Sequence, residues 1–100
     1  MSIIKVDYGS LDGGGTPTRE TITLQTNVVY DTGVKASDIS MLGCFKSLSS
    51  TSYAFGYFEN GEMTFSSVGY YMTIAVDSTS GNVTLTYVQT GGITFEMFYY

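Results

Sequence analysis

The residue pair Asn60-Gly61 constrains this chain more than any other feature, because it predicts a tight β-hairpin. A two-residue type I′ turn needs positive φ at both central positions, and Asn and Gly tolerate that conformation best. We therefore predict a hairpin over residues 53–68, with Glu59 facing Glu62 beside the turn. The alternation of its arms predicts one apolar, aromatic face: Tyr53, Phe55, Tyr57, Met63 and Phe65.

The rest of the chain repeats the two-residue period, with turn residues at a spacing of roughly ten residues. The predicted strands cover residues 3–8, 21–30, 38–46, 53–68 as the hairpin, 70–76, 82–89 and 93–100. Turns or loops are expected at 31–33, 47–52, 77–81 and 91–92. About eight short strands predict an all-β fold, an antiparallel β-sandwich that is either jelly-roll-like or Ig-like.

The same period assigns a set of inward-facing side chains to the core. These are Ile22, Leu24, Val28, Ile39, Met41, Phe45, Phe55, Tyr57, Phe65, Met72, Ile74, Val76, Val83, Leu85, Ile93 and Phe95. Segment 38–46 is apolar on both faces, which predicts a strand buried on both sides or lying at a subunit contact. A short helix is the alternative for that segment, and Gly43 speaks against it.

Residues 1–18 are predicted to be a flexible N-terminal arm with a glycine-rich tether, and residues 19–100 the sandwich domain. Within the arm, Ile4, Val6 and Tyr8 share one face of a short strand. Gly13–Gly15 and Pro17 then interrupt regular structure. Such an arm can pair with its own sheet or with that of a neighbouring copy, and the second option favours oligomers.

Composition and charge exclude several classes of partner. Charged residues make up 13% of the 100 residues, against about 25% in typical domains. The surface is therefore largely polar and uncharged, which suits contact with other protein chains or with sugars. The net charge of −5 argues against nucleic acid and against an anionic membrane surface. No apolar run approaches the roughly 20 residues of a spanning helix, and we expect no signal peptide and synthesis in the cytoplasm.

The sequence argues against an enzyme and predicts no catalytic, cofactor or metal site. It contains no histidine, which excludes Ser-His-Asp and Cys-His arrangements. Cys44 is its only cysteine, and we expect a buried apolar residue rather than a reactive thiol. Glu59 and Glu62 could form a carboxylate pair for sugar chemistry, but a solvated hairpin tip is the simpler interpretation. Residues 77–82 faintly resemble a calcium loop, and a hydrogen-bonded turn explains them better.

Tyrosines are the remaining candidates for recognition. They could form a stacking platform for sugar rings, or they could be core and interface residues. With the apolar residues of the arm, they define a candidate interaction surface: Ile4, Val6, Tyr8, Tyr53, Tyr57, Tyr70, Tyr71, Tyr99 and Tyr100. Whether Tyr70 and Tyr71 face the core or the solvent stays open at this point.

Two stretches resemble a known group of proteins. Residues 1–9, followed by Gly13–Gly15, resemble the start of small structural proteins of phages and prophages of Gram-positive bacteria. Residues 33–41, with the Tyr/Phe strands and residues 95–100, are similar to a β-sandwich domain of phage tail and fibre proteins. In that domain a Gly-Phe-x-Pro-x-x-Val-type element opens a strand. Here Val34 replaces the aromatic residue and Ala36 the proline.

The resemblance implies a virion component that assembles, or that binds a receptor on the bacterial surface, without catalytic residues. We therefore expect a phage or prophage structural protein, of tail, fibre or head-decoration type. Its partners would be other copies of itself and other virion proteins. The alternative is a carbohydrate-binding module that recognises bacterial surface glycan through exposed tyrosines. A host-directed inhibitor with an acidic surface is a third hypothesis.

Overall fold

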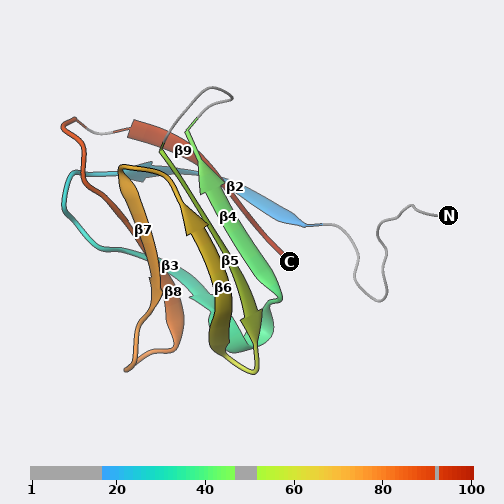
Figure 1. Ribbon diagram of the computed structural model, residues 1–100. Coiled ribbons are helices and arrows are strands. Elements are labelled where there is room, and N and C mark those ends of the chain that lie inside the picture. Colours follow the sequence, from blue (N-terminus) through green and yellow to red (C-terminus); the bar gives the residue numbers. More distant parts are fainter. Residues whose placement is uncertain (1–16, 47–51, 92) are drawn as a thin grey trace, which may run out of the picture.

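Two antiparallel β-sheets pack face to face in the computed structural model, which describes residues 17–46, 52–91 and 93–100 (Figure 1). The described strands are β2 (Thr18–Leu24), β3 (Tyr30–Lys35), β4 (Met41–Phe45), β5 (Tyr53–Glu59), β6 (Glu62–Val68), β7 (Met72–Val76), β8 (Asn82–Tyr87) and β9 (Ile93–Tyr99). A 3₁₀ turn, η1 (Ala36–Asp38), precedes β4. The predicted fold class, an all-β antiparallel sandwich of about eight short strands, is confirmed.

The larger sheet has five strands in the order β2-β9-β4-β5-β6, and the smaller has three in the order β3-β8-β7. The chain changes sheet between β2 and β3, β3 and β4, β6 and β7, and β8 and β9. Strands from the two ends of the described chain therefore become neighbours, as β2 pairs with β9 and β3 with β8. Among the described residues, no helix has the length and apolar character needed to cross a membrane.

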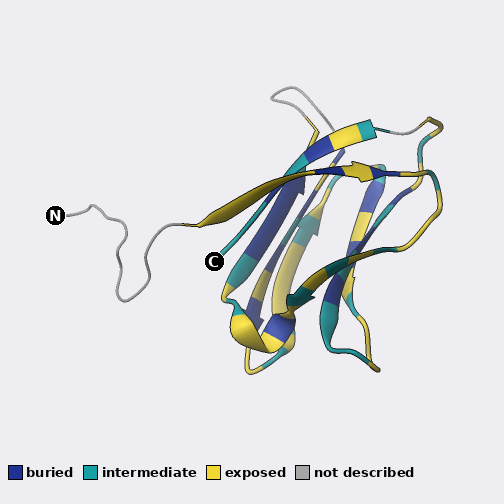
Figure 2. Ribbon diagram, turned by 180° about the vertical axis from the view of Figure 1, so that it is seen from behind, coloured by how far each residue is buried: buried dark blue, intermediate teal, exposed yellow. Residues whose placement is uncertain are grey.

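The core lies between the two sheets, where buried and exposed residues alternate along the strands (Figure 2). Its members are Ile22, Leu24, Ala36, Leu42, Cys44, Ala54, Phe58, Met72, Ile74, Val83, Leu85, Tyr87, Phe95 and Met97. At its centre, the rings of Tyr87 and Phe95 meet edge to face with centroids 5.1 Å apart. Each fully buried large side chain contributes about 1.5–3 kcal/mol, so this layer supplies most of the driving force for folding.

The predicted hairpin is confirmed, including its turn. Asn60 and Gly61 have φ angles of 54° and 82°, and Glu59 pairs with Glu62. Beyond the turn a β-bulge changes the register, because Phe58 pairs with Met63 while Tyr57 pairs with Phe65. Thr64 is therefore the additional residue in β6.

The prediction that Phe55, Tyr57 and Phe65 point inward is wrong. Ala54 and Phe58 are the buried residues of β5, whereas Tyr57 is 45% and Phe65 56% exposed. Met63 is also misplaced, since it packs on the core side while the aromatic residues lie outside. Both faces of the hairpin are apolar, so the two-residue period could not decide which one the second sheet covers.

In strand β4, too, the buried face is the opposite of the predicted one. Leu42 and Cys44 are buried, and the predicted inward residues Met41 and Phe45 are only half-buried on the opposite side. The segment is a strand and not a helix from Met41 onward, and only η1 shows helical geometry.

The predicted strand over residues 21–30 is wrong in its second half. β2 ends at Leu24, and the chain then crosses to the other sheet, where β3 begins at Tyr30. Asn27 has a φ of 60°, and its backbone N–H donates to the Tyr87 carbonyl oxygen. Val28, predicted to be buried, is 53% exposed because it lies in this crossing.

The turn predicted at residues 31–33 is instead a register irregularity inside β3. The Asp31 carboxylate accepts a hydrogen bond from the backbone N–H of Gly33, whose φ is 74°. The Thr32 hydroxyl donates to the Val83 carbonyl oxygen of β8. Side chains thus replace regular ladder hydrogen bonds, and the strand continues to Lys35.

Candidate functional site

The outer face of the five-stranded sheet, opposite the core, carries a continuous group of aromatic side chains. Strand register places Phe98 of β9, Phe55 of β5 and Phe65 of β6 on this side. Five rings form a connected row, which we call the aromatic row: Phe45, Phe98, Phe55, Tyr57 and Phe65. The consecutive strands β4, β5 and β6 and the distant strand β9 therefore contribute to one surface.

The rings of the row touch in succession. The Phe45 and Phe98 centroids lie 6.1 Å apart, and those of Phe98 and Phe55 6.4 Å apart. Phe55 meets Tyr57 edge to face at 4.9 Å, and Tyr57 lies 6.0 Å from Phe65. These separations are within the range of favourable aromatic pairs, each worth about 0.5–1.5 kcal/mol beyond burial. Each ring of the row is therefore stabilised by contact with at least one neighbouring ring.

Gly43 of β4 makes the row possible. It pairs with Phe98 on one side and with Phe55 on the other. A Cβ atom at this position would lie 2.5 Å from Phe98 Cζ and 3.0 Å from Phe55 Cδ1. Because glycine has no side chain, the two rings can lie over the middle strand and meet there.

The two ends of the face differ in charge. Glu59 and Glu62 flank the hairpin tip, next to the end where Tyr57 and Phe65 lie. Lys46 directly follows Phe45 at the opposite end of β4 and is exposed, but the alternation of the strand assigns it to the side of Leu42 and Cys44 and not to this face. Within the described residues, the face between these ends carries only the charged pair of Arg19 and Glu96.

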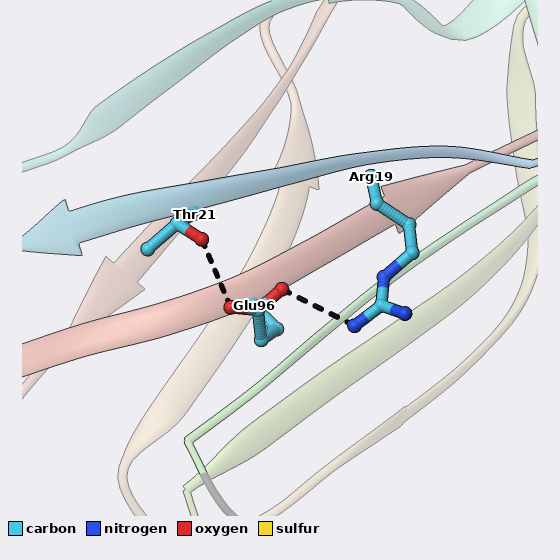
Figure 3. A network of polar contacts seen from close by, with 3 residues as sticks. All are labelled: Arg19, Thr21 and Glu96. Carbon is cyan, nitrogen blue, oxygen red and sulfur yellow. Dashed lines mark hydrogen bonds and ion pairs between the residues drawn. The ribbon is translucent and has the colours of Figure 1, made fainter.

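Arg19, Thr21 and Glu96 form a polar corner beside the aromatic row (Figure 3). Arg19 Nη2 lies 3.4 Å from Glu96 Oε1, and Thr21 Oγ1 donates to Glu96 Oε2 at 2.9 Å. The ion pair is exposed and therefore contributes little to stability. An open pocket of about 310 Å³ lies here, lined by Pro17, Arg19, Phe45, Glu96, Met97 and Phe98.

The structure brings only some of the predicted interaction residues together. Tyr57, 45% exposed, belongs to the aromatic row, and Tyr53, 37% exposed, lies opposite Phe45 on the same face. Tyr70 and Tyr71 lie in the β6–β7 connection, where Tyr70 is 82% exposed and Tyr71 packs against the core.

At the end of the chain, Tyr99 packs against the core and donates a hydrogen bond to Glu20, and Tyr100 is half-buried. Ile4, Val6 and Tyr8 lie outside the described residues. Sequence reasoning missed Phe98 as a surface residue and placed Phe45, Phe55 and Phe65 in the core. The signal that could have found them is Gly43 between two apolar residues of one strand, since a glycine there leaves room for neighbouring rings.

Cys44 is buried in the core, and Asp77 belongs to a hydrogen-bonded turn. Burial raises the pKa of the Cys44 thiol to about 12, with the charge of Glu96 as a smaller cause, so the thiol is neutral and shielded. Residues 77–82 form a hydrogen-bonded turn, in which Asp77 accepts from the backbone N–H of Ser80. These hydrogen bonds hold the pKa of the Asp77 carboxyl below its ordinary value. Across residues 17–46, 52–91 and 93–100, no group of three His, Cys, Asp or Glu residues is placed to hold a metal ion.

Comparison of the chain with protein-family models, with curated proteins and with solved structures finds no match in any of the three.

Proposed function

We propose that this chain is a non-enzymatic structural protein of a phage or prophage virion, which works by assembling with copies of itself and with other virion proteins. The observation that carries the proposal is the aromatic row on the outer sheet face. Phe65 is 56% exposed and Tyr57 is 45% exposed, so these two large aromatic side chains face the solvent in the single chain. Contiguous exposed apolar patches of this kind mark protein–protein contacts.

The resemblance of residues 1–9 and 33–41 to virion proteins supports the choice of assembly. In this proposal the aromatic row is the first docking element, and the N-terminal arm is the second. Residues 3–8 have the alternation of a strand. Among the described strands, β2 lies at an edge of the larger sheet and pairs only with β9. An extended segment that adds to a sheet edge is a common way to join protein chains. Tail, fibre and head decoration are the virion positions that this role fits.

The direct test is whether the chain is part of a particle. Virus particles released by cells that carry the gene would be purified on a density gradient and analysed by mass spectrometry. The proposal expects the chain to co-purify with the particle proteins at a fixed ratio. Its absence from particles that contain the other products of the same gene cluster would contradict the proposal.

The role of the arm has its own test, deletion of residues 1–15. The truncated protein should keep the circular dichroism and melting behaviour of the β-sandwich, because the described core lies within residues 22–97. Its assembly, measured as the mass of the particles formed, should be weaker. Assembly as strong as that of the whole chain would remove the arm from the proposal.

A carbohydrate-binding module is the second candidate, and the polar corner is what favours it. The pocket there combines the apolar walls of Phe45 and Phe98 with the charged side chains of Arg19 and Glu96. Sugar sites use a similar combination of ring stacking and directed hydrogen bonds. A bacterial glycan array should then give a signal that Arg19→Ala, in the pocket, and Tyr53→Ala, opposite Phe45 on the same face, both reduce. No signal from any glycan would count against this candidate.

A further inference from the structure

Four described strands form the edges of the two sheets, β2 and β6 in the larger sheet and β3 and β7 in the smaller. Exposed edges attract other strands, and proteins protect them with bulges, irregularities or short length. The register of β6 shifts at its bulge, that of β3 shifts between Asp31 and Lys35, and β7 has only five residues. β2 instead pairs with β9 over seven consecutive residues without a shift. It is therefore the one described edge that is both long and regular.

The side of the sandwich beside β2 is also its open side. On the opposite side the edge strands β6 and β7 contact each other, which brings the two sheets together there. No comparable contact joins β2 to β3 in the described part of the chain. A further strand beside β2 would therefore extend the larger sheet on the side where the two sheets do not meet.

The two faces of β2 define what a further strand must present. Ile22 and Leu24 point into the core, where they are 5% and 1% exposed. Arg19, Thr21 and Thr23 are exposed on the other face. Residues directly opposite each other in an antiparallel pair lie on the same face. A matching segment therefore carries apolar side chains at every second position, on its inner side.

Residues 3–8 have this pattern. They alternate between two groups of side chains, the apolar group Ile4, Val6 and Tyr8 and the mixed group Ile3, Lys5 and Asp7. The six residues match all but one of the seven in β2. Residues 9–17 join the segment to β2 and contain Gly13–Gly15. A flexible connection of this length spans roughly 16 Å on average, which is enough to link two adjoining molecules.

Charge selects the register between residues 3–8 and β2. When Asp7 lies directly opposite Arg19, opposite charges face each other on the outer side. A shift of two residues in one direction would place Lys5 opposite Arg19, and like charges in that position repel each other. A shift in the other direction would bring Asp7 opposite Thr21, which is bonded to the Glu96 carboxylate.

We infer that residues 3–8 of one copy of the chain add to the free edge of β2 in a second copy, as an antiparallel strand with Asp7 opposite Arg19 and Ile4 beside Ile22. Pro17 directly precedes β2, and the backbone before a proline favours an extended conformation. This favours a neighbouring copy over the same chain as the acceptor. The inference rests on the self-association in the proposed function, and it specifies the acceptor edge, the strand direction and the register.

The first test is amide hydrogen exchange of the full chain, followed by NMR at low and at millimolar protein concentration. Every second N–H of an edge strand points away from its neighbour, so these amides of β2 exchange quickly in a single chain. They should exchange at least about tenfold more slowly at the high concentration, while amides at the free edge of β6 should not change. Equally slow exchange at both concentrations would assign the pairing to the chain's own arm and overturn the inference. Fast exchange in an associated chain would also overturn it.

The second test asks which side of the arm faces the core. Ile4→Asn/Val6→Asn should weaken association at least about tenfold in sedimentation velocity, because both side chains lie on the inner side. The matched control Ile3→Asn/Lys5→Asn changes two residues on the outer side and should stay within about threefold of wild type. The reverse ranking would overturn the proposed orientation. The core of the described residues lies outside this segment, so near-UV circular dichroism should find both variants folded.

A double-mutant cycle tests the register. Asp7→Ser and Arg19→Ser should each weaken association, and the double variant should lose less than the product of the two effects, by a factor of about two to five. Asp7→Ser combined with Lys35→Ser is the matched control, because Lys35 lies in β3 and donates to the Ser80 carbonyl oxygen. The effects of this control pair should multiply. Independent effects of Asp7→Ser and Arg19→Ser would overturn the register.

The inference and the proposed function can fail separately. If the chain associates while the outward amides of β2 still exchange quickly, the edge is not the contact, and assembly through another surface remains. If the arm pairs with β2 of a second copy but the chain is absent from virus particles, the inference holds and the virion role falls. A wild-type chain that stays monomeric at millimolar concentration overturns the inference.

Discussion

Phe98 lies so close over Gly43 that a Cβ atom at position 43 would stand 2.5 Å from the Phe98 Cζ atom. This contact joins β9 to β4 on the outer face and holds the row together at its middle. Phe55 approaches the same position from β5, at 3.0 Å. The aromatic row therefore depends on one residue without a side chain.

Gly43→Ala should destabilise the protein by about 1–3 kcal/mol, because the added methyl group displaces both rings. For a domain of this size the melting temperature should fall by about 4–8 °C per kcal/mol. Thermal unfolding followed by circular dichroism measures it. In a Phe98→Ala background, the same substitution should cost much less, and equal costs in the two backgrounds would show that the contact with Phe98 is unimportant.

Gly61→Ala should destabilise the hairpin by about 1–2 kcal/mol, since an L-residue in the left-handed region clashes with its own backbone. Gly61 has a φ of 82° at the second position of the turn. Asn60→Gly is the matched control, because glycine also accepts positive φ, and it should cost less than about 1 kcal/mol. Urea unfolding of both variants distinguishes them, and equal losses would argue against the type I′ geometry.

Cys44 should react with a thiol reagent at pH 8 only as fast as the protein opens, because the thiol is buried and its pKa is raised to about 12. Denatured protein should react within the mixing time of the assay. Rapid labelling of the native protein would contradict the burial of Cys44.

The same pKa shift predicts how stability changes at alkaline pH. The thiol is neutral in the folded state up to about pH 12, but ionises near pH 9 when unfolded. The contribution of the neutral thiol to the free energy of unfolding is therefore fully present below pH 9. It is lost as the pH rises toward 12, by about 1.4 kcal/mol per pH unit. In Cys44→Ala the free energy of unfolding should fall less steeply between pH 9 and 12. An unchanged dependence on pH in that variant would show that other groups cause it.

Asp77 should stabilise the β7–β8 turn only while it is ionised. Hydrogen bonds from Ser80 lower the pKa of the carboxyl in the folded state, so its contribution is present above about pH 3.9 and is lost as the pH falls through the lowered value. Carboxyl chemical shifts followed by NMR should give the lowered pKa directly. Asp77→Ala should be less stable than wild type at pH 7, and the difference should shrink in acid. A carboxyl that titrates at its ordinary value would contradict the hydrogen bonds.

Where local chemistry decides the structure, the sequence was a sufficient guide. The turn at Asn60-Gly61 needs only its two residues, and β8 has one apolar face, so Val83 and Leu85 were placed correctly. β4 and β5 have two apolar faces, and the choice between them depends on where β7 and β8 pack. The small side chains of Cys44 and Ala54 are buried, and the large rings lie outside.

The candidate site was predictable only in part, for a related reason. Tyr53 and Tyr57 were both candidate interaction residues, although the two-residue period had also assigned Tyr57 to the core. The partnership of Phe45 with Phe98 depends on β9 lying beside β4, across 53 positions of sequence. No local pattern encodes that neighbourhood, because it arises only when the chain has crossed between the sheets four times.

The central claim is that this protein works by binding copies of itself, and light scattering across a concentration series of the full chain tests it most directly. The chain has a mass of 10.9 kDa. The weight-average mass should rise with concentration to at least twice that value and should level off at a whole-number multiple. A mass that stays at 10.9 kDa up to millimolar concentration would contradict the claim.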